Sequence, residues 1–366
     1  IMNRLDCPYC EKHRRAGYAY CGNCGKSLDC PYCEHYRAST YAYCGQCGRP
    51  LYVTAPPQFK KSSATRWFGI LSAILTSMFL LIAAVALYVY AIDIFLFLSN
   101  KSYGLLILIP YPYTFAVISE IWLQLYWMLL LVILTLSFIK LVHELYRYLG
   151  RRTFASGNSE SGKPAIYWIG IMWPATMFLQ IAIMYLSVLL FGTELTVPDM
   201  DFDQRGLMFL LADASVWEEL ITRVLLIGVP LFILAVARKK KDSWRFLLGG
   251  SGVDRLSMTL VVIAALVFGY GHEAGWGFAK VIPSFLFGLA AGYLFIRYGL
   301  YAAILIHFVN DYLMAYVWLG GSETVMGLAS LGLIALGALS TVLLAVKVWR
   351  FLKEFRNRPN YPKGLE

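Results

Sequence analysis

Residues 206–237 read GLMFLLADASVWEELITRVLLIGVPLFILAVA, an apolar run that is long enough to cross a bilayer as a single helix. The middle of this run holds three ionisable side chains within six residues, Glu218, Glu219 and Arg223. Charged groups are costly at membrane depth, so such a cluster indicates a functional site. Glu219 and Arg223 are four residues apart and share a helix face, where they can pair. Glu218 faces about 100° away, which keeps its carboxylate free to exchange protons.

The whole chain has the composition of a polytopic membrane protein. Of its 366 residues, 59% are hydrophobic and 15% are charged, and the mean hydropathy is +0.60. These values exclude an ordinary soluble domain and predict an all-α membrane protein with about eight transmembrane helices. The predicted spans are residues 67–92, 118–143, 165–191, 206–237, 255–271, 279–297, 301–319 and 324–349. The short stretch 103–117 contains Pro110 and Pro112, so we expect an interfacial or re-entrant segment there.

Basic residues collect on one side of the predicted spans. They lie before the first span, between the second and third, between the fourth and fifth, at the end of the sixth and after the eighth. In chain order these basic residues include Lys60, Lys61, Arg66, Arg147, Arg151, Arg152, Lys163, Arg238, Lys239, Lys240, Lys241, Arg245, Arg255, Arg297, Arg350 and Lys353. The other side has Lys101, Arg205 and Lys280, and an acidic loop with Glu194, Asp199, Asp201 and Asp203. Positive charge favours the cytoplasmic side, so both termini are expected in the cytoplasm. The net charge of +10 is accordingly assigned to contacts with the lipid bilayer rather than with nucleic acid.

The first 50 residues form an internal repeat that predicts two metal sites. Residues 5–27 and 28–50 align cysteine for cysteine, and each copy has two C-x-x-C pairs separated by ten residues. The predicted ligands are Cys7, Cys10, Cys21, Cys24, Cys30, Cys33, Cys44 and Cys47. Four thiolates complete a closed tetrahedral shell, so each copy should hold one structural Zn²⁺. The alternative is a disulfide scaffold, but so short a copy cannot bury a useful core, and metal would supply the folding free energy.

This module resembles a double zinc ribbon, followed by a linker at residues 51–66. It lacks a clustered basic patch that would favour nucleic-acid binding. A cytoplasmic protein partner of the ribbons is therefore the interaction we expect. The remaining chain divides into N-terminal transmembrane helices (67–164), a helical core (165–320) and a last helix with a basic cytoplasmic tail (321–366).

Two later spans also carry polar groups at membrane depth. Phe268-Gly269-Tyr270-Gly271-His272-Glu273 ends the fifth span, and His307-Phe308-Val309-Asn310-Asp311 lies in the seventh. His272 and His307 are the only histidines in the last 220 residues, and they occur on neighbouring segments to the glutamate cluster. This convergence favours an active site over polar contacts that merely hold helices together.

The motifs EExxxR (Glu218, Glu219, Arg223), FxxxH (Phe268, His272) and HxxxN/D (His307, Asp311) resemble those of the CPBP family of intramembrane proteases. That family includes the Ras-converting CAAX prenyl endopeptidases and bacteriocin-processing relatives, and the resemblance covers roughly residues 165–320. It implies a glutamate-dependent peptidase acting near the C-terminus of a membrane-anchored substrate. By this resemblance Glu218 activates the attacking water and His272 positions that water. His307 and residue 311 stabilise the oxyanion. Glu219 and Arg223 hold the catalytic side chains in orientation.

The residue at position 311 departs from the family pattern, because an asparagine donates a hydrogen bond directly whereas a carboxylate must first be protonated. Asn310 is adjacent but faces about 100° away along a helix. Either Asp311 orients His307, or activity is weak. A metal mechanism is a competing idea, but position 276 is Trp, so the H-E-x-x-H pattern begun at His272 is incomplete. We therefore expect no catalytic metal.

Residue counting places these groups at different depths. Glu218 lies ~18 Å from the non-cytoplasmic end of its span, whereas His307 lies only ~9 Å from the cytoplasmic end of its own. They can meet only if some spans are tilted, broken or shifted, and Gly228-Val229-Pro230 is the predicted break. Two other functions remain open: a catalytically silent membrane adaptor whose ribbons recruit a partner, and a proton-coupled transporter.

Overall fold

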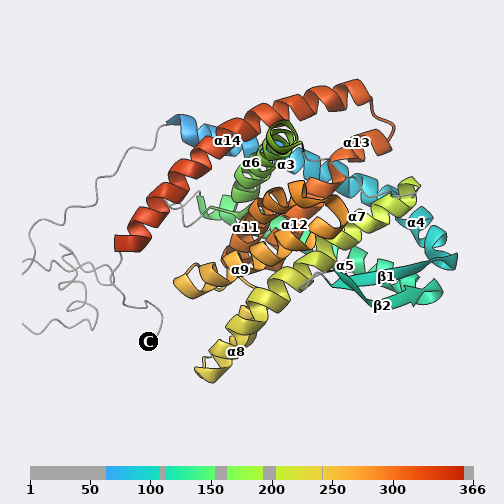
Figure 1. Ribbon diagram of the computed structural model, residues 1–366, viewed down its shortest axis with the longest axis horizontal. Coiled ribbons are helices and arrows are strands. Elements are labelled where there is room, and N and C mark those ends of the chain that lie inside the picture. The colour runs from blue at the N-terminus through green and yellow to red at the C-terminus, as the bar shows by residue number, and fades with distance from the viewer. Residues whose placement is uncertain (1–62, 108–111, 153–162, 193–202, 241, 358–366) are drawn as a thin grey trace, which may run out of the picture. The chain divides into compact units, whose positions relative to one another are not determined.

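The computed structural model describes residues 63–107, 112–152, 163–192, 203–240 and 242–357 (Figure 1). The predicted zinc ribbons at 1–50, residues 51–62 of the predicted linker and most of the acidic loop lie outside the described residues. The two zinc sites and their eight cysteine ligands therefore stay predictions.

Eight described helical stretches are long and apolar enough to cross a membrane, which confirms the predicted number of spans. They are Trp67–Val89, Glu120–Leu149, Ala165–Phe191, Gln204–Ala237, Arg255–Trp276, Phe278–Tyr298, Leu300–Trp318 and Glu323–Arg350. Each agrees with its predicted range to within a few residues, because long apolar runs are the strongest signal in such a sequence. The chain is an integral membrane protein.

The long helices carry these spans, and short turns connect several of them. The long helices are α3 (Ser63–Val89), α5 (Glu120–Arg152), α6 (Ala165–Phe191), α7 (Gln204–Glu219), α9 (Arg255–Gly271), α11 (Val281–Tyr298), α12 (Leu300–Asp311) and α14 (Glu323–Asn357). The short helical elements are α4 (Ala91–Phe97), η1 (Leu98–Asn100), η3 (Leu220–Gly228), α8 (Val229–Ala237), η4 (Ser243–Phe246), α10 (Glu273–Trp276), η5 (Phe278–Lys280), η6 (Tyr312–Met314) and α13 (Ala315–Trp318).

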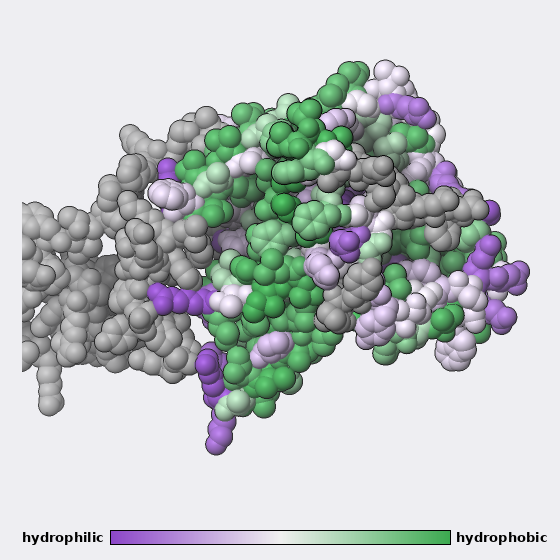
Figure 2. All heavy atoms as spheres, viewed as in Figure 1, coloured by the Kyte–Doolittle hydropathy of each residue, from purple (hydrophilic) through white to green (hydrophobic). Residues whose placement is uncertain are grey.

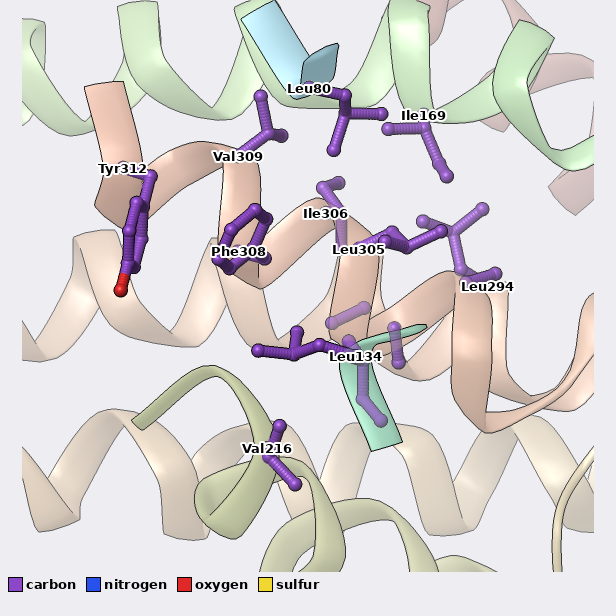
Figure 3. Packing of buried hydrophobic residues seen from close by; sticks show 14 of the residues in the cluster. Leu80, Leu134, Ile169, Val216, Leu294, Leu305, Ile306, Phe308, Val309 and Tyr312 are labelled. Carbon is purple, nitrogen blue, oxygen red and sulfur yellow. The ribbon is translucent and has the colours of Figure 1, made fainter. Parts of the chain in front are cut away.

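Helix α12 is the centre of the fold. Its residues Ala302–Val309 are all buried, and it packs against α5, α6, α7 and α11. Figure 3 shows its apolar side chains between Leu80 and Ile169 on one side and Leu134 and Val216 on the other. By contrast, apolar side chains cover much of the outer surface in Figure 2, as a lipid-facing surface requires. The helix that carries His307 is thus enclosed by protein.

The segment between α4 and α5 is a β-hairpin and departs from the all-α prediction. Strand β1 (Ser102–Ile107) pairs antiparallel with β2 (Tyr113–Ser119), with an irregularity between Leu105 and Leu106. The expectation that residues 103–117 are not a ninth span is confirmed, whereas a position at the membrane interface stays a prediction. The two-residue period of a strand is hard to distinguish from a helical period over so short an apolar stretch. The two prolines are compatible with either structure, so the sequence did not predict strands here.

The hairpin is attached to α7 by hydrogen bonds from polar side chains. The Tyr103 hydroxyl donates to Asp213 Oδ2 at 2.7 Å, and Tyr126 Oη donates to Asp213 Oδ1. Trp217 Nε1 donates to the Leu106 carbonyl at 2.6 Å. Burial raises the pKa of Tyr103 above its ordinary range, and the Asp213 carboxylate raises it further, so this phenol stays protonated and donates. The hairpin is therefore fixed one residue from Glu218.

The span of Glu218 is widened rather than broken. Leu220–Gly228 forms a π-helix, after which α8 continues to Ala237. Pro230 near the start of α8 has no N–H to donate, and wider turns before it are one way for a helix to absorb the missing hydrogen bond. A Cβ at Gly228 would lie 2.2 Å from the Leu247 carbonyl oxygen, so this position accepts only glycine. The predicted break at Gly228-Val229-Pro230 is thus wrong.

Candidate active site

The two glutamates are the last residues of α7, where the helix changes to π turns. Glu219 and Arg223 are fully buried and form the pair that their spacing indicates, with Arg223 Nε 3.0 Å from Glu219 Oε2. Arg223 also donates to Thr222 Oγ1 at 2.6 Å, and its guanidinium lies 4.9 Å from the centre of the Phe268 ring. The donors of the Arg223 guanidinium are therefore used within the protein, and Arg223 holds Glu219 in place.

Glu219 in turn holds His307. The His307 Nδ1 atom lies 2.9 Å from Glu219 Oε1. A carboxylate paired with an arginine is an acceptor, so Nδ1 carries the hydrogen of this bond. The imidazole packs edge-on against the Phe287 ring, with 5.1 Å between the ring centres, and against Phe268 at 6.1 Å. These contacts fix the direction of the other nitrogen, Nε2, toward Glu218.

His272 is held by its own helix. It caps the C-terminus of α9, and its Nδ1 atom lies 2.8 Å from the Phe268 carbonyl oxygen. A carbonyl can only accept, so Nδ1 is the donor and a neutral His272 presents Nε2 as an acceptor. The Phe268 ring lies 4.6 Å from the imidazole. Phe268 therefore supports both histidines and Arg223.

Three of the four predicted catalytic residues meet at one oxygen atom. Glu218 Oε2 lies 3.9 Å from His272 Nε2 and 3.9 Å from His307 Nε2. The Glu218 side chain is 21% exposed, but its Oε2 atom is buried and has no hydrogen-bond partner in the described structure. The different depths expected from residue counting do not keep these groups apart. The helix bounds contribute to this, because α9 ends one residue before His272 and α12 begins only seven residues before His307.

Asp311 lies on the Nε2 side of His307, and Asn310 contacts Asp311. Asp311 Oδ2 lies 3.4 Å from His307 Nε2, and Asn310 Nδ2 donates to Asp311 Oδ1 at 3.1 Å. The Asn310 amide is thus directed toward Asp311, and its Oδ1 atom is buried without a partner in the described part of the chain. Contact between Asp311 and His307 agrees with the first alternative, in which Asp311 orients the imidazole.

Sequence reasoning assigned neither of two charged neighbours to this site: a packing or interfacial position was favoured for Asp213, and Lys280 was not connected with the chemistry. Asp213 interacts electrostatically with Glu218 from the same helix. Lys280, which was interpreted only as a topology signal, interacts electrostatically with Glu218 and Asp311. Asp213 lies in the same apolar run as Glu218, so its cost at membrane depth was a usable signal. No sequence pattern links Lys280 to the site, because tertiary folding brings it there.

Within the described ranges, no three His, Cys, Asp or Glu side chains are grouped so as to hold a metal ion. The expectation that no catalytic metal takes part stays a prediction, which a chelator experiment can test.

Comparison with known protein families finds a similarity in the helical core. Residues 205–313 match the family model described as Type II CAAX prenyl endopeptidase Rce1-like. This segment is under a third of the chain, and it runs from the first turn of α7 to the turn after α12, so it contains Glu218, His272 and His307. No curated protein matches the chain, and no solved structure matches it. The similarity to CAAX endopeptidases therefore covers the helices that build the candidate site.

Proposed function

We propose that this protein is an intramembrane endopeptidase that hydrolyses a peptide bond near the C-terminus of a membrane-anchored substrate, with prenylated CAAX-type peptides as the first substrates to test. The observation that supports this most is the position of Glu218 Oε2, which is buried, unpartnered and 3.9 Å from two imidazole nitrogens. The similarity of residues 205–313 to CAAX endopeptidases supports the same reaction.

In the proposed mechanism a water molecule attacks the scissile carbonyl carbon. A separation of 3.9 Å is too long for a direct hydrogen bond and is one that a shared water can bridge. Glu218 accepts one proton of this water, while His272 Nε2 accepts a hydrogen bond from the other and sets the direction of attack. The water oxygen bonds to the carbonyl carbon, and the carbonyl oxygen becomes an oxyanion. As the carbonyl re-forms, the C–N bond breaks and Glu218 gives its proton to the leaving nitrogen, which yields a carboxylate product and a free amine. Atoms and charge balance without a covalent enzyme intermediate.

His307 supplies the oxyanion contact in this mechanism. Its Nδ1–H is used by Glu219, so donation from Nε2 requires the ring to carry both protons. The carboxylates of Glu219 and Asp311 lie on either side of the imidazole and offset its charge. Asp311 lies 3.4 Å from the same Nε2 atom and favours the protonated ring by its charge, and the Nε2–H turns from Asp311 to the oxyanion as that anion forms. Asn310 holds Asp311.

The test is cleavage of matched prenylated and plain peptides by purified protein in lipid bilayers. Glu218→Gln keeps the shape of the side chain but removes the base, so we expect a loss of about 100-fold or more in kcat. Glu273→Gln is the matched control, because Glu273 follows His272 directly but, within the described residues, forms no ion pair with a residue of the site. Equal cleavage by wild type and Glu218→Gln would refute the mechanism.

A second candidate function is a catalytically silent membrane adaptor, which Asp311 favours because the family motif has a hydrogen-bond donor there. In either case we propose that the ribbons bind two structural Zn²⁺ ions and recruit a cytoplasmic protein, and that both termini are cytoplasmic. Folded protein with full zinc content that cleaves no peptide of either kind would support the adaptor.

A further inference from the structure

Lys280 stands beside the candidate site on a rigid connection. It ends η5, and only eight residues separate it from His272. Backbone hydrogen bonds close this short link, from Trp276 N to the His272 carbonyl at 3.1 Å and from Lys280 N to the Gly277 carbonyl at 3.1 Å. Gly277 has φ +75°, a conformation that glycine adopts without strain, and it turns the chain between α10 and η5. The lysine is therefore placed by the fold rather than by a loose loop.

The ammonium group of Lys280 has unused hydrogen-bonding capacity. The side chain is half-buried, and its Nζ atom lies 5.0 Å from the centre of the Trp276 ring. Among the described residues, no carboxylate lies within the 4.0 Å of an ion pair with Lys280. Three donors on a partly desolvated cation favour an anionic partner.

The charges around Lys280 place such a partner at the reaction site. Lys280 lies close enough to Asp311 and Glu218 for an attractive electrostatic interaction with both carboxylates. The other fixed cation of the site, Arg223, is fully buried and paired with Glu219, so it cannot reach a substrate. Lys280 is thus the cation that a ligand entering beside Glu218 would meet.

We propose that Lys280 binds the free C-terminal carboxylate of the peptide substrate. The inference rests on the proposed endopeptidase function and names the feature of the substrate that the site recognises. Every peptide that ends shortly after its scissile bond carries this one obligatory anion close to the reacting carbonyl. Binding it at Lys280 would restrict cleavage to bonds near a chain end, whereas internal bonds of the same sequence would be rejected.

The test uses two peptides that differ only at the C-terminus, a free carboxylate in one and a carboxamide in the other. Wild type should cleave the carboxylate peptide with a kcat/KM about 10- to 100-fold higher, mainly through KM, as expected for a hydrogen bond to a charged group. Lys280→Gln should lower the rate for the carboxylate peptide by the same factor and leave the carboxamide peptide unchanged. Lys280→Arg should restore the preference.

Lys101→Gln is the matched control, because Lys101 also lies 5.0 Å from an aromatic ring centre, that of Phe97, but belongs to the hairpin side of the fold. Lys101→Gln should prefer the carboxylate peptide over the carboxamide peptide by the same factor as wild type. Equal handling of the two peptides by wild type, or an undiminished preference in Lys280→Gln, would overturn the proposal.

Binding separates this proposal from the proposed reaction. Fluorescent versions of both peptides are titrated against Glu218→Gln protein in bilayers, where no cleavage is needed. Tighter binding of the carboxylate peptide that disappears in Glu218→Gln/Lys280→Gln supports Lys280 even if wild type proves inactive. Equal binding of the two peptides overturns it even if wild type is an active peptidase.

Discussion

His307 Nδ1 lies 2.9 Å from Glu219 Oε1, so an imidazole of α12 is held by a carboxylate of α7. That carboxylate is itself paired with Arg223 at 3.0 Å, and both partners are fully buried. The three side chains form one continuous polar contact inside an apolar core. The position of His307 beside Glu218 therefore depends on two residues that do not touch the substrate.

Arg223→Met should strongly destabilise the protein, because it leaves Glu219 as a buried, uncompensated charge. Removing one partner of a buried pair typically costs about 3–5 kcal/mol. Glu219→Gln/Arg223→Met removes both charges and should recover a substantial part of this free energy. The measurement is a double-mutant cycle of unfolding free energies in mixed micelles. If the losses of unfolding free energy in the two single variants simply add in the double variant, Glu219 and Arg223 are not coupled.

Asp311→Asn should keep kcat within about tenfold of wild type, because an amide of the same shape can accept from His307 and also donate to the oxyanion. Asp311→Leu has neither capacity and should lose about 100-fold or more in kcat. Both variants are compared in the peptide cleavage assay. A complete loss in Asp311→Asn would show that the carboxylate has a role other than orienting His307.

Tyr103→Phe should lower the free energy of unfolding by about 1.5–3 kcal/mol, since it removes one of the two phenol hydrogen bonds to the buried Asp213 carboxylate. Tyr113→Phe is the matched control, because Tyr113 is 51% exposed on the other strand of the hairpin. Proteolysis at the hairpin should also become faster in Tyr103→Phe alone. Identical unfolding of both variants would mean that Tyr103 does not fix the hairpin.

The same tyrosine predicts a pH effect. Its pKa in the folded protein is raised above the ordinary value of 10.0, so its contribution to stability is complete below pH 10 and falls as pH rises further. The difference in unfolding free energy between wild type and Tyr103→Phe should therefore shrink above pH 10. A difference that stays constant to pH 11 would contradict this.

Zinc analysis should find two ions per chain, and Cys7→Ser/Cys10→Ser should reduce this to one. The helical core needs neither ion in the proposed mechanism. A variant that lacks all eight cysteines should therefore retain cleavage in the presence of 1,10-phenanthroline. Inhibition of that variant by the chelator, with recovery on adding Zn²⁺, would favour a metal mechanism.

The spans and the order of the motifs could be predicted from sequence because apolar length and rare charges at membrane depth are strong local signals. Glu219 and Arg223 pair as their spacing indicates, since a helix fixes that distance whatever surrounds it. The hairpin was missed because its strands are too short for periodicity to separate them from a helix. The electrostatic interaction of Lys280 with Glu218 joins two different elements, and no local sequence pattern contains it.

The π-helical turns of Leu220–Gly228 store surplus chain between the acidic pair and the end of the span. A π turn holds one residue more than an α turn, so deleting a single residue there would tighten the helix while Val229–Ala237 keep their orientation relative to the acids. The lower half of this span and the acidic pair can therefore keep one common register whether or not the extra residue is present.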